Sequence, residues 1–382
     1  MKRKISVTTG TRADYGFLKP VLKEISKSKK LELKLIVTGM HLSKKFGYTI
    51  QEIQNDGFKI STKIPFLIND DTNFEMAKTL GKGIIEFSKI FHKIKPEINL
   101  IFGDRDEMMA SAIAAYHLNI PNAHIHGGDR TQGGIDEYNR HAITKISNIH
   151  FAASKKSALR IIKMGENPKY VFFTGSPGID QIKQNDITSK TDLEKKFGIQ
   201  FSGKEILLLQ HSITTQTDLS NSQILQTLNA IVKLKKPIIA IAPNSDPGHK
   251  KIFQQLKRFS RNYSFVKVYP SLPRRDYLGL LKNCGVLVGN SSSGIIEANY
   301  FNTPILNIGI RQKGREKDAN IIEVPQNENH IFKAISKIFY SKIKKKHTIK
   351  KLYGVGNSSK KITSHLETIK LSGKLIQKQI FY

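Results

Sequence analysis

The stretch Lys4-Ile5-Ser6-Val7-Thr8-Thr9, followed by Gly10-Thr11-Arg12-Ala13-Asp14-Tyr15-Gly16, decides the fold class of this chain. Its first six residues predict a β-strand, because β-branched side chains dominate them. A loop bounded by glycines follows, and residues 17–28 then have the apolar spacing of a helix. A strand, a loop and a helix in this order predict a βαβ unit and a parallel sheet.

The same alternation continues along the chain and restarts after a break. Before the break, strands are predicted at residues 32–38, 99–102, 123–126 and 150–153, and helices at 72–94, 107–117 and 136–147. The pattern stops near residues 175–178, and polar residues follow up to 204. Beyond it, strands are predicted at 205–210, 237–242, 265–269, 285–289 and 304–308. These predict an α/β fold of two Rossmann-like, doubly wound parallel-sheet domains facing a central cleft.

The break sets the predicted domain boundaries. We expect an N-terminal Rossmann-like domain at residues 1–178 and a C-terminal Rossmann-like domain at 204–356. The final segment, 357–382, has a helical pattern, and we expect it to pack back on the N-terminal domain. A length of 382 residues fits two domains of ordinary size.

The chain is strongly basic, with 62 Lys and Arg against 31 Asp and Glu and a net charge of +31. Such a charge suggests a nucleic acid, an anionic membrane or an acidic metabolite as partner. The charge is spread along the chain, however, and the basic cluster at residues 344–351 is typical of a solvated connector. We therefore expect solvated lysine faces, and no nucleic acid as partner.

Cysteine usage and hydropathy point to a cytoplasmic protein without membrane insertion. The single cysteine, Cys284, lies in an apolar run and excludes an internal disulfide. No apolar run approaches the roughly 20 residues that a membrane-spanning helix needs.

Polar residues collect where the predicted strands end. In open α/β sheets, ligands bind beyond the carboxyl ends of the strands. The loops at these ends are residues 10–16, 39–41, 103–105, 126–129, 210–211, 243–246 and 289–294. They predict one polar cleft between the two domains.

The loop Gly289-Asn290-Ser291-Ser292-Ser293-Gly294 precedes an apolar stretch that opens a helix. Backbone N–H groups and hydroxyls in such a loop can bind a phosphate, although an ordinary serine cap has a similar sequence. Glu297 lies one turn further on. It suits either a ribose contact or a favourable charge in the first helical turn.

Arginine is concentrated near these loops in a chain that otherwise uses lysine. Only guanidinium offers a planar fork for bidentate phosphate or carboxylate contacts. Eight of the 12 arginines are Arg12, Arg105, Arg130, Arg140, Arg274, Arg275, Arg311 and Arg315. Of these, Arg140 is spaced to pair with Asp136 four residues earlier on one helix.

Acid–base candidates lie in the same region. Paired carboxylates in a closed cleft can divide acid and base roles, and Asp104, Asp129, Asp136 and Glu137 fall within 34 positions. Histidine is the other candidate type; the candidates are His41, His124, His126, His141 and His211, with His126 and His211 favoured because they end strands. No spacing of Cys and His resembles a metal site, so we expect neither a metal nor another cofactor.

Assembled in order, these motifs resemble the hydrolysing UDP-N-acetylglucosamine 2-epimerases of sialic-acid and related nonulosonate synthesis. The resemblance runs from residue 4 to about 365. The stretches that carry it are residues 9–16, 37–41, 103–105, 135–145, 209–211, 289–294 and 311–315.

The resemblance implies the two-domain fold of the glycosyltransferase B type, a dimer or tetramer, and a UDP-sugar substrate. In this family's reaction UDP leaves C1 as a proton leaves C2, and water adds to the resulting glycal to release the free 2-epimeric sugar. The implied catalytic residues are Asp104, His126, Asp129, Asp136 and His211. The implied UDP and substrate contacts are Arg12, Arg105, Asn244, Ser291, Ser292, Ser293, Gly294, Glu297 and Arg315.

Two departures leave the substrate open. Relatives often carry Glu where this chain has His126, so either His126 or Asp129 takes that role, with His126 slightly favoured. Relatives also often have Pro where Ser212 stands. The predicted reaction converts UDP-GlcNAc to ManNAc and UDP, with UDP-2,4-diacetamido-2,4,6-trideoxyglucose, of legionaminic acid synthesis, as the alternative sugar.

The same architecture also suits a UDP-sugar glycosyltransferase or a catalytically inactive UDP-sugar sensor. Non-hydrolysing epimerases share the fold as well, but they are less favoured because they differ at residues 124–130.

Overall fold

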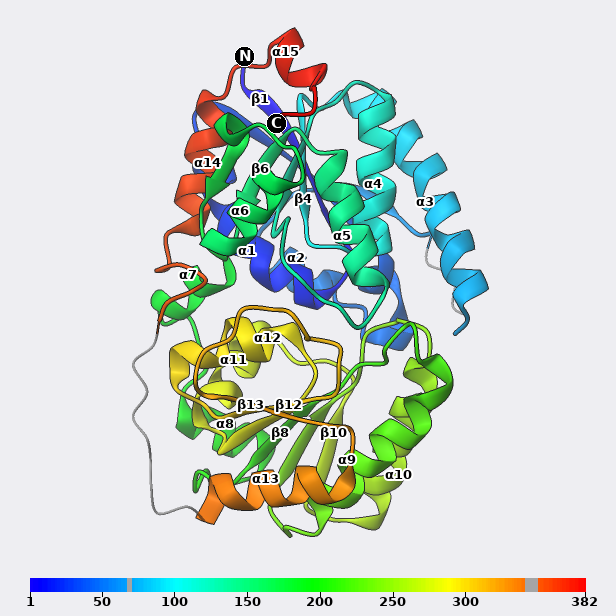
Figure 1. Ribbon diagram of the computed structural model, residues 1–382, viewed down its shortest axis with the longest axis vertical. Coiled ribbons are helices and arrows are strands. Elements are labelled where there is room, and N and C mark those ends of the chain that lie inside the picture. The colour runs from blue at the N-terminus through cyan, green and yellow to red at the C-terminus, as the bar shows by residue number, and fades with distance from the viewer. Residues whose placement is uncertain (67–70, 341–349) are drawn as a thin grey trace.

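The computed structural model describes residues 1–66, 71–340 and 350–382 and shows two α/β domains stacked along the long axis (Figure 1). Each is built on one parallel sheet, of seven and six strands. The predicted α/β class with two Rossmann-like, doubly wound sheets is confirmed.

The N-terminal sheet has the order β3-β2-β1-β4-β5-β6-β7. Its strands are β1 (Arg3–Thr9), β2 (Leu31–Thr38), β3 (Ile60–Ile64), β4 (Ile98–Phe102), β5 (Asn122–Ile125), β6 (Ile149–Ala152) and β7 (Val171–Phe173). The order reverses between β1 and β4. Beyond the carboxyl ends of two such neighbours the connections diverge, and ligands bind in the crevice left there.

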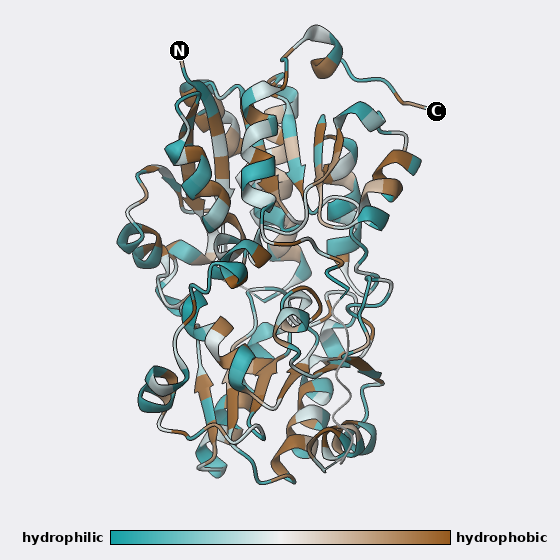
Figure 2. Ribbon diagram, turned by 90° about the vertical axis from the view of Figure 1, so that its left-hand side faces the viewer, coloured by the Kyte–Doolittle hydropathy of each residue, from teal (hydrophilic) through white to brown (hydrophobic). Residues whose placement is uncertain are grey.

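Helices cover both faces of this sheet with apolar side chains. On one face, α1 (Arg12–Lys27) and α2 (Ile50–Asn55) pack on β1, β2 and β4 through residues such as Leu18 and Ile53. On the other face lie α3 (Asn73–Ile94), α4 (Asp106–His117) and α5 (Ile135–Lys145). Next to β6 and β7 packs α6 (Lys155–Lys163). The apolar strands run through the middle of the domain (Figure 2).

The second sheet repeats the arrangement with the order β10-β9-β8-β11-β12-β13 and reverses between β8 and β11. Its strands are β8 (Ile206–Leu209), β9 (Ile238–Ile241), β10 (Val266–Tyr269), β11 (Val286–Gly289), β12 (Ile305–Ile308) and β13 (Ile321–Val324). One face is covered by α9 (Ser220–Val232), α10 (His249–Asn262) and α13 (Glu328–Tyr340), the other by α8 (Lys190–Phe197) and α11 (Arg274–Asn283).

The chain returns to the first domain at its end. Ile362 and Leu366 of α14 (Ser358–Thr368) are fully buried in the core beside α1. The next helix, α15 (Gly373–Ile376), places Leu375 in that core too. The red segment therefore lies on the blue-to-green domain (Figure 1). The exact domain boundaries stay a prediction.

Three local expectations need correction or fall outside the described residues. Residues 12–16, expected in a loop, form the first turn of α1, because Thr11 and Asp14 form a capping box that starts the helix there. The strands β3, β7 and β13 were not predicted. Of the basic cluster at 344–351, residues 344–349 lie outside the described residues.

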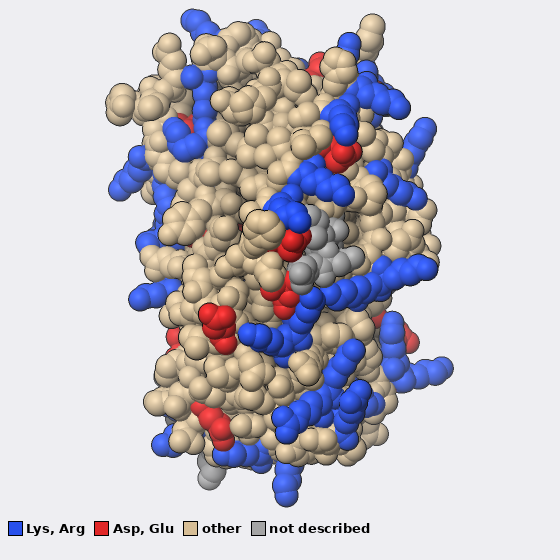
Figure 3. Space-filling model, turned by 90° about the vertical axis from the view of Figure 1, so that its right-hand side faces the viewer, with Lys and Arg blue, Asp and Glu red and all other residues tan. Residues whose placement is uncertain are grey.

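No helix among the described residues is long and apolar enough to cross a membrane. Lysine and arginine side chains are dispersed over the face in Figure 3, from one end of the molecule to the other, with acidic groups between them. On this face the charge is spread over both domains, as expected for solvated lysines.

Candidate active site

The two switch points face each other across the cleft between the domains. Beyond β1 and β4 come Gly10 and the Gly103-Asp104 pair; beyond β8 and β11 come His211 and Asn290. Two cavities lie between them and share Thr11, Phe17, Ser292 and Arg311 in their walls. The sequence prediction of a single polar cleft agrees with this geometry.

The first cavity has both apolar and polar groups in its wall. Leu209, Ile241, Pro243 and Leu272 supply apolar surface. Arg12, His211 and the hydroxyls of the serine loop, residues 289–294, supply polar groups. A ligand that joins a flat heterocycle to an anion would match this combination.

The serine loop begins the short helix α12 (Ser292–Ile296). Ser291 caps it by accepting from the N–H of Ser293 at 3.4 Å, and the hydroxyls of Ser293 and Tyr277 lie 2.5 Å apart. Gly294 packs closely on the strand below, because a Cβ there would lie 2.9 Å from the side chain of Leu287. The loop therefore presents Ser291, Ser292 and Ser293 to the cavity.

Glu297, the expected ribose contact, is fully buried behind this loop. Its two carboxylate oxygens bind the guanidinium of Arg274 and the hydroxyl of Ser293. Arg274 also stacks over Phe17 at 4.9 Å. Glu297 thus links the serine loop to α1 of the other domain through Arg274.

The second cavity holds the carboxylates. Asp104 pairs with Arg140 of α5, and Asp136 pairs with Arg311 of the other domain at 2.9 Å. The predicted pairing of Arg140 with Asp136 is wrong. Arg140 instead contacts Asp104, which lies two residues beyond the end of β4.

The two carboxylates influence each other. Burial raises the pKa of Asp136 to about 6, the negative charge of Asp104 adds to the rise, and Arg311 opposes it. A carboxyl group with a pKa close to neutral can both accept and donate a proton at physiological pH. Asp136 thus has the character expected of an acid–base group.

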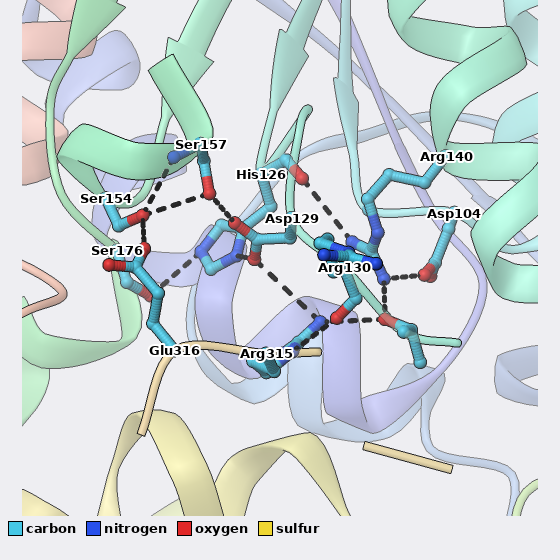
Figure 4. A network of polar contacts seen from close by, with 12 residues as sticks. Asp104, His126, Asp129, Arg130, Arg140, Ser154, Ser157, Ser176, Arg315 and Glu316 are labelled. Carbon is cyan, nitrogen blue, oxygen red and sulfur yellow. Dashed lines mark hydrogen bonds and ion pairs between the residues drawn. The ribbon is translucent and has the colours of Figure 1, made fainter. Parts of the chain in front are cut away.

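His126 lies in a dense network under this cavity (Figure 4). Its Nδ1 contacts Asp129 at 3.0 Å and its Nε2 contacts the hydroxyl of Ser176 at 2.9 Å. Asp129 also accepts from Ser157 at 2.7 Å. Burial opposes ionisation of Asp129, but His126 and the nearby Arg315 outweigh it and lower its pKa.

His126 and Asp129, the two candidates for the role of the glutamate found in relatives, take different places in this network. His126 lines the cavity, whereas Asp129 lies behind it as a carboxylate that fixes the imidazole. Both ring nitrogens of His126 are engaged with protein groups. Asp104 and Asp136, by contrast, each keep one oxygen that makes no hydrogen bond within the described residues.

His211 ends β8 as expected and lines the first cavity. Its Nδ1 accepts from the backbone N–H of Asn244 at 3.3 Å, and Asn290 holds its backbone through two hydrogen bonds of 2.7 and 2.8 Å. Burial lowers the pKa of His211 to about 3, and Arg311 adds to the effect. The ring is therefore neutral near pH 7.

Arg105, an expected substrate contact, lines the second cavity and reaches across the cleft to the other domain. Its guanidinium contacts Asp246 at 3.1 Å, Ser245 at 3.2 Å and Glu107 at 3.2 Å. Sequence reasoning did not select Asp246, although its position after a strand in the 243–246 loop was a usable signal. Gln312 and Thr131, which also line the second cavity, carried no such signal.

Several other residues named as candidates from the sequence have partners outside the two cavities. Arg275 is largely exposed and pairs with Asp186. His41 is buried between Thr9 and Thr49, and His124 is held by the carbonyl of Gly103 at 2.7 Å, so both are structural. His141 pairs with Glu137 on the same helix. No group of His, Cys, Asp and Glu within the described part of the chain could hold a metal ion.

Comparison with known proteins defines the family. The model of the family described as UDP-N-acetylglucosamine 2-epimerase matches residues 23–367. The UDP-N,N'-diacetylbacillosamine 2-epimerase (hydrolyzing) of Legionella pneumophila is 37% identical over 99% of both chains. This chain belongs to the UDP-N-acetylglucosamine 2-epimerase family.

Two further relatives place this epimerase within the family. A UDP-N-acetylglucosamine 2-epimerase of Neisseria meningitidis is 34% identical over 88% of this chain and 87% of its own. A crystal structure of UDP-GlcNAc 2-epimerase from the same species, bound to UDP-GlcNAc, superposes with a TM-score of 0.80 over 95% and 99% of the two chains, at 21% identity. The predicted enzyme class, a hydrolysing UDP-sugar 2-epimerase, and the fold of glycosyltransferase B type are confirmed.

Proposed function

We propose that this epimerase acts on a UDP-2,4-diacetamido-2,4,6-trideoxy sugar and releases its free 2-epimer and UDP. The observation that carries this proposal is the apolar wall of the cavity that also contains Asp104 and Asp136. The similarity to the Legionella enzyme over the whole chain supports it. The reaction would supply a sugar for nonulosonic acid synthesis.

The nucleotide fits the first cavity. The uracil would lie against Leu209, Pro243 and Leu272, and the diphosphate would lie at the serine loop. Ser291, Ser292 and Ser293 would donate hydroxyls, and Arg12 and Arg311 would supply positive charge, since charge-assisted contacts to phosphate are the strong ones. Glu297 would accept from the ribose after a small rearrangement of its bond to Ser293.

The carboxylates fit the proton transfers. One of Asp104 and Asp136 would take the proton from C2 while the C1–O bond to UDP breaks, which gives the glycal. Water would then add at C1 while a proton returns to C2 on the opposite face, which gives the free 2-epimer. Both carboxylates line the same cavity, so we assign the roles to the pair and not to one member.

The remaining groups would support charge and position. Neutral His211 could donate from Nε2 to the departing phosphate oxygen, because its Nδ1 already accepts a hydrogen bond. The Asp129–His126 pair would form the floor under the sugar and fix Arg315 at the diphosphate side. Such positioning groups contribute to rate by holding the reacting geometry.

The sugar substituents are inferred from the wall of the second cavity. Phe17 and Phe102 stack at 5.1 Å, and Ile296 joins them in that wall. A methyl at C6 and an acetamido at C4 gain from burial against such groups, whereas hydroxyls there would lose water contacts. UDP-GlcNAc is the second candidate, favoured by the Neisseria relative.

Parallel kinetics with the two UDP-sugars test this proposal. We expect a kcat/KM at least tenfold higher for the diacetamido-trideoxy sugar, since one methylene in a pocket already discriminates about 10- to 200-fold. Ile296→Ser should reduce the preference. A higher kcat/KM for UDP-GlcNAc would contradict the sugar assignment, and transfer of the sugar to an added acceptor would favour a glycosyltransferase instead.

A further inference from the structure

The loops at residues 130–135 and 310–315 carry cleft residues from opposite domains and lie against each other. The N–H of Gln132 donates to the carbonyl of Lys313 at 3.2 Å. Gly133 has no space for a side chain, because a Cβ there would lie 2.4 Å from the backbone of Arg311. Ile135 donates to the hydroxyl of Thr214 at 2.9 Å. These backbone contacts place Arg311 beside Asp136 independently of the ion pair between them.

Arg311 faces both halves of the cleft. One guanidinium nitrogen donates to the carbonyl of Asn290 at 3.2 Å, and the other donates to Asp136 at 2.9 Å. The side chain is only 12% exposed, so its charge is poorly screened. It lines the cavity of the serine loop and also the cavity of the carboxylates.

A diphosphate at the serine loop would compete for this guanidinium. The nitrogen of Arg311 that does not bind Asn290 is bound to Asp136 in the structure. Phosphate oxygens are strong acceptors for arginine, and two charges would replace one carboxylate as its partner. Binding would therefore weaken the contact between Arg311 and Asp136.

We propose that Arg311 is a positioning residue that holds Asp136 in the empty cleft and releases it when the diphosphate of the substrate binds. This inference rests on the proposed function of the cleft. It couples the availability of a reacting carboxylate to the presence of the nucleotide. An empty or water-filled cleft then contains a neutralised ion pair and no free base.

The sign of the coupling follows from the charges around Asp136. Asp104 and Asp246 raise its pKa, and Arg311 and Arg140 lower it. When the diphosphate binds Arg311, the positive charge of Arg311 lowers the pKa of Asp136 less, so this pKa rises. Asp104 keeps its own partner, Arg140, because that pair does not involve Arg311.

A titration of Asp136 with and without UDP tests this directly. Protein labelled with carbon-13 at the aspartate carboxyl carbons is titrated by NMR, and Asp136→Asn assigns the signal. UDP should raise the pKa of Asp136 by about 1 unit or more, the size of an opposite-charge effect at this distance. In Arg311→Gln the pKa should be raised before UDP is added, and UDP should then shift it less.

The controls separate the coupling from a general loss of structure. Arg311→Lys keeps the charge and should restore much of the UDP-dependent shift. Arg275→Gln removes an exposed arginine outside the cleft and should behave as the wild type. An equal UDP-dependent shift in the wild type and in Arg311→Gln, or no shift in either, would overturn the inference.

Turnover gives a second, independent readout. In the wild type, the acid limb of kcat should lie at higher pH than the acid limb of kcat/KM, and Arg311→Gln should bring the two limbs together. A purely structural role would change kcat or KM without moving the limbs. If no UDP-sugar is turned over while UDP still shifts Asp136, the proposed function fails and the coupling stands.

Discussion

In the proposed mechanism, Asp104 and Asp136 carry the proton transfers. We expect Asp104→Asn and Asp136→Asn each to lower kcat by about 10²–10⁴, because an amide cannot take or give the proton. KM should change little in Asp104→Asn, since the serine loop and not this carboxylate would bind the diphosphate. Release of UDP measured by a coupled assay checks this.

A control aspartate distinguishes a chemical effect from a general one. Asp218 is exposed near the start of α9, and Asp218→Asn should keep full activity. A loss of less than about threefold in either cleft variant would remove that residue from the proton transfers, since a general acid or base contributes far more.

Asp129 has a different expected role, in position and stability. It is buried with His126, Ser157 and Arg315 around it, so Asp129→Ala leaves charged and polar groups without a partner. Breaking such a buried network costs about 3–5 kcal/mol in the free energy of unfolding. Denaturant unfolding measures this cost. An unchanged unfolding midpoint, with lost activity, would instead place Asp129 in direct chemistry.

Single residues were predictable where a strand end placed them. Asp104, His126 and His211 follow strands, and the structure brings them to one cleft. The partners were not predictable, because pairing across the cleft depends on how two domains meet. Arg140 was assigned to Asp136 by helical spacing, although Asp104 is the carboxylate that its guanidinium reaches.

At the scale of elements, the three strands that sequence reasoning missed all lie on sheet edges, whereas the fourth edge strand, β10, was predicted. Central strands such as β8 are buried along their whole length, and their continuous apolar runs are easy to recognise. By contrast, β3 and β13 include exposed positions, and β7 has only three residues. Their pairing comes from neighbours distant in sequence and leaves little local signal.

The helix α14 holds the end of the chain on the first domain. Leu366 is fully buried against α1, so Leu366→Ala should lower the free energy of unfolding by about 2–5 kcal/mol. Ser364→Ala on the exposed side of the same helix serves as the matched control. Equal stability of the two variants in urea would show that α14 contributes little to the domain.

The buried carboxylate of Glu166 anchors the C-terminal segment through an ion pair with Lys378. Glu166 contacts Lys145, Lys378 and His150, and although burial opposes it, these contacts lower the pKa of Glu166 to about 2. A lowered pKa stabilises the fold above the ordinary value of 4.5, and this stabilisation is lost as pH falls toward about 2. The difference in unfolding free energy between wild type and Glu166→Gln should therefore shrink over this range. A difference that grows on acidification would contradict this.

For the whole molecule, the nucleotide is expected to join the two domains. Arg12 comes from the first domain and the serine loop from the second, and both line one cavity. A ligand at 100 times its Kd stabilises the bound form by about 2.7 kcal/mol. Calorimetry should show a single unfolding transition whose midpoint temperature rises when UDP is added. Uridine, which lacks the phosphates, should raise that temperature less. Two transitions, with only one shifted by UDP, would contradict a site shared between domains.

The architecture was largely accessible from the sequence, because parallel α/β domains repeat a local pattern of strand, loop and helix. The contacts between the two domains could not be predicted from the sequence. Cross-cleft contacts such as Arg105–Asp246 and Arg311–Asp136 join residues 141 and 175 positions apart, and no periodicity encodes them.

The most direct test of the proposed chemistry is an incubation in deuterated water followed by proton NMR. The UDP-2,4-diacetamido-2,4,6-trideoxy sugar and UDP-GlcNAc are each incubated with the protein. Elimination and hydration predict UDP together with a free 2-epimeric sugar that carries deuterium at C2. Release of the sugar with its original proton and configuration at C2 would contradict the mechanism and leave only simple hydrolysis.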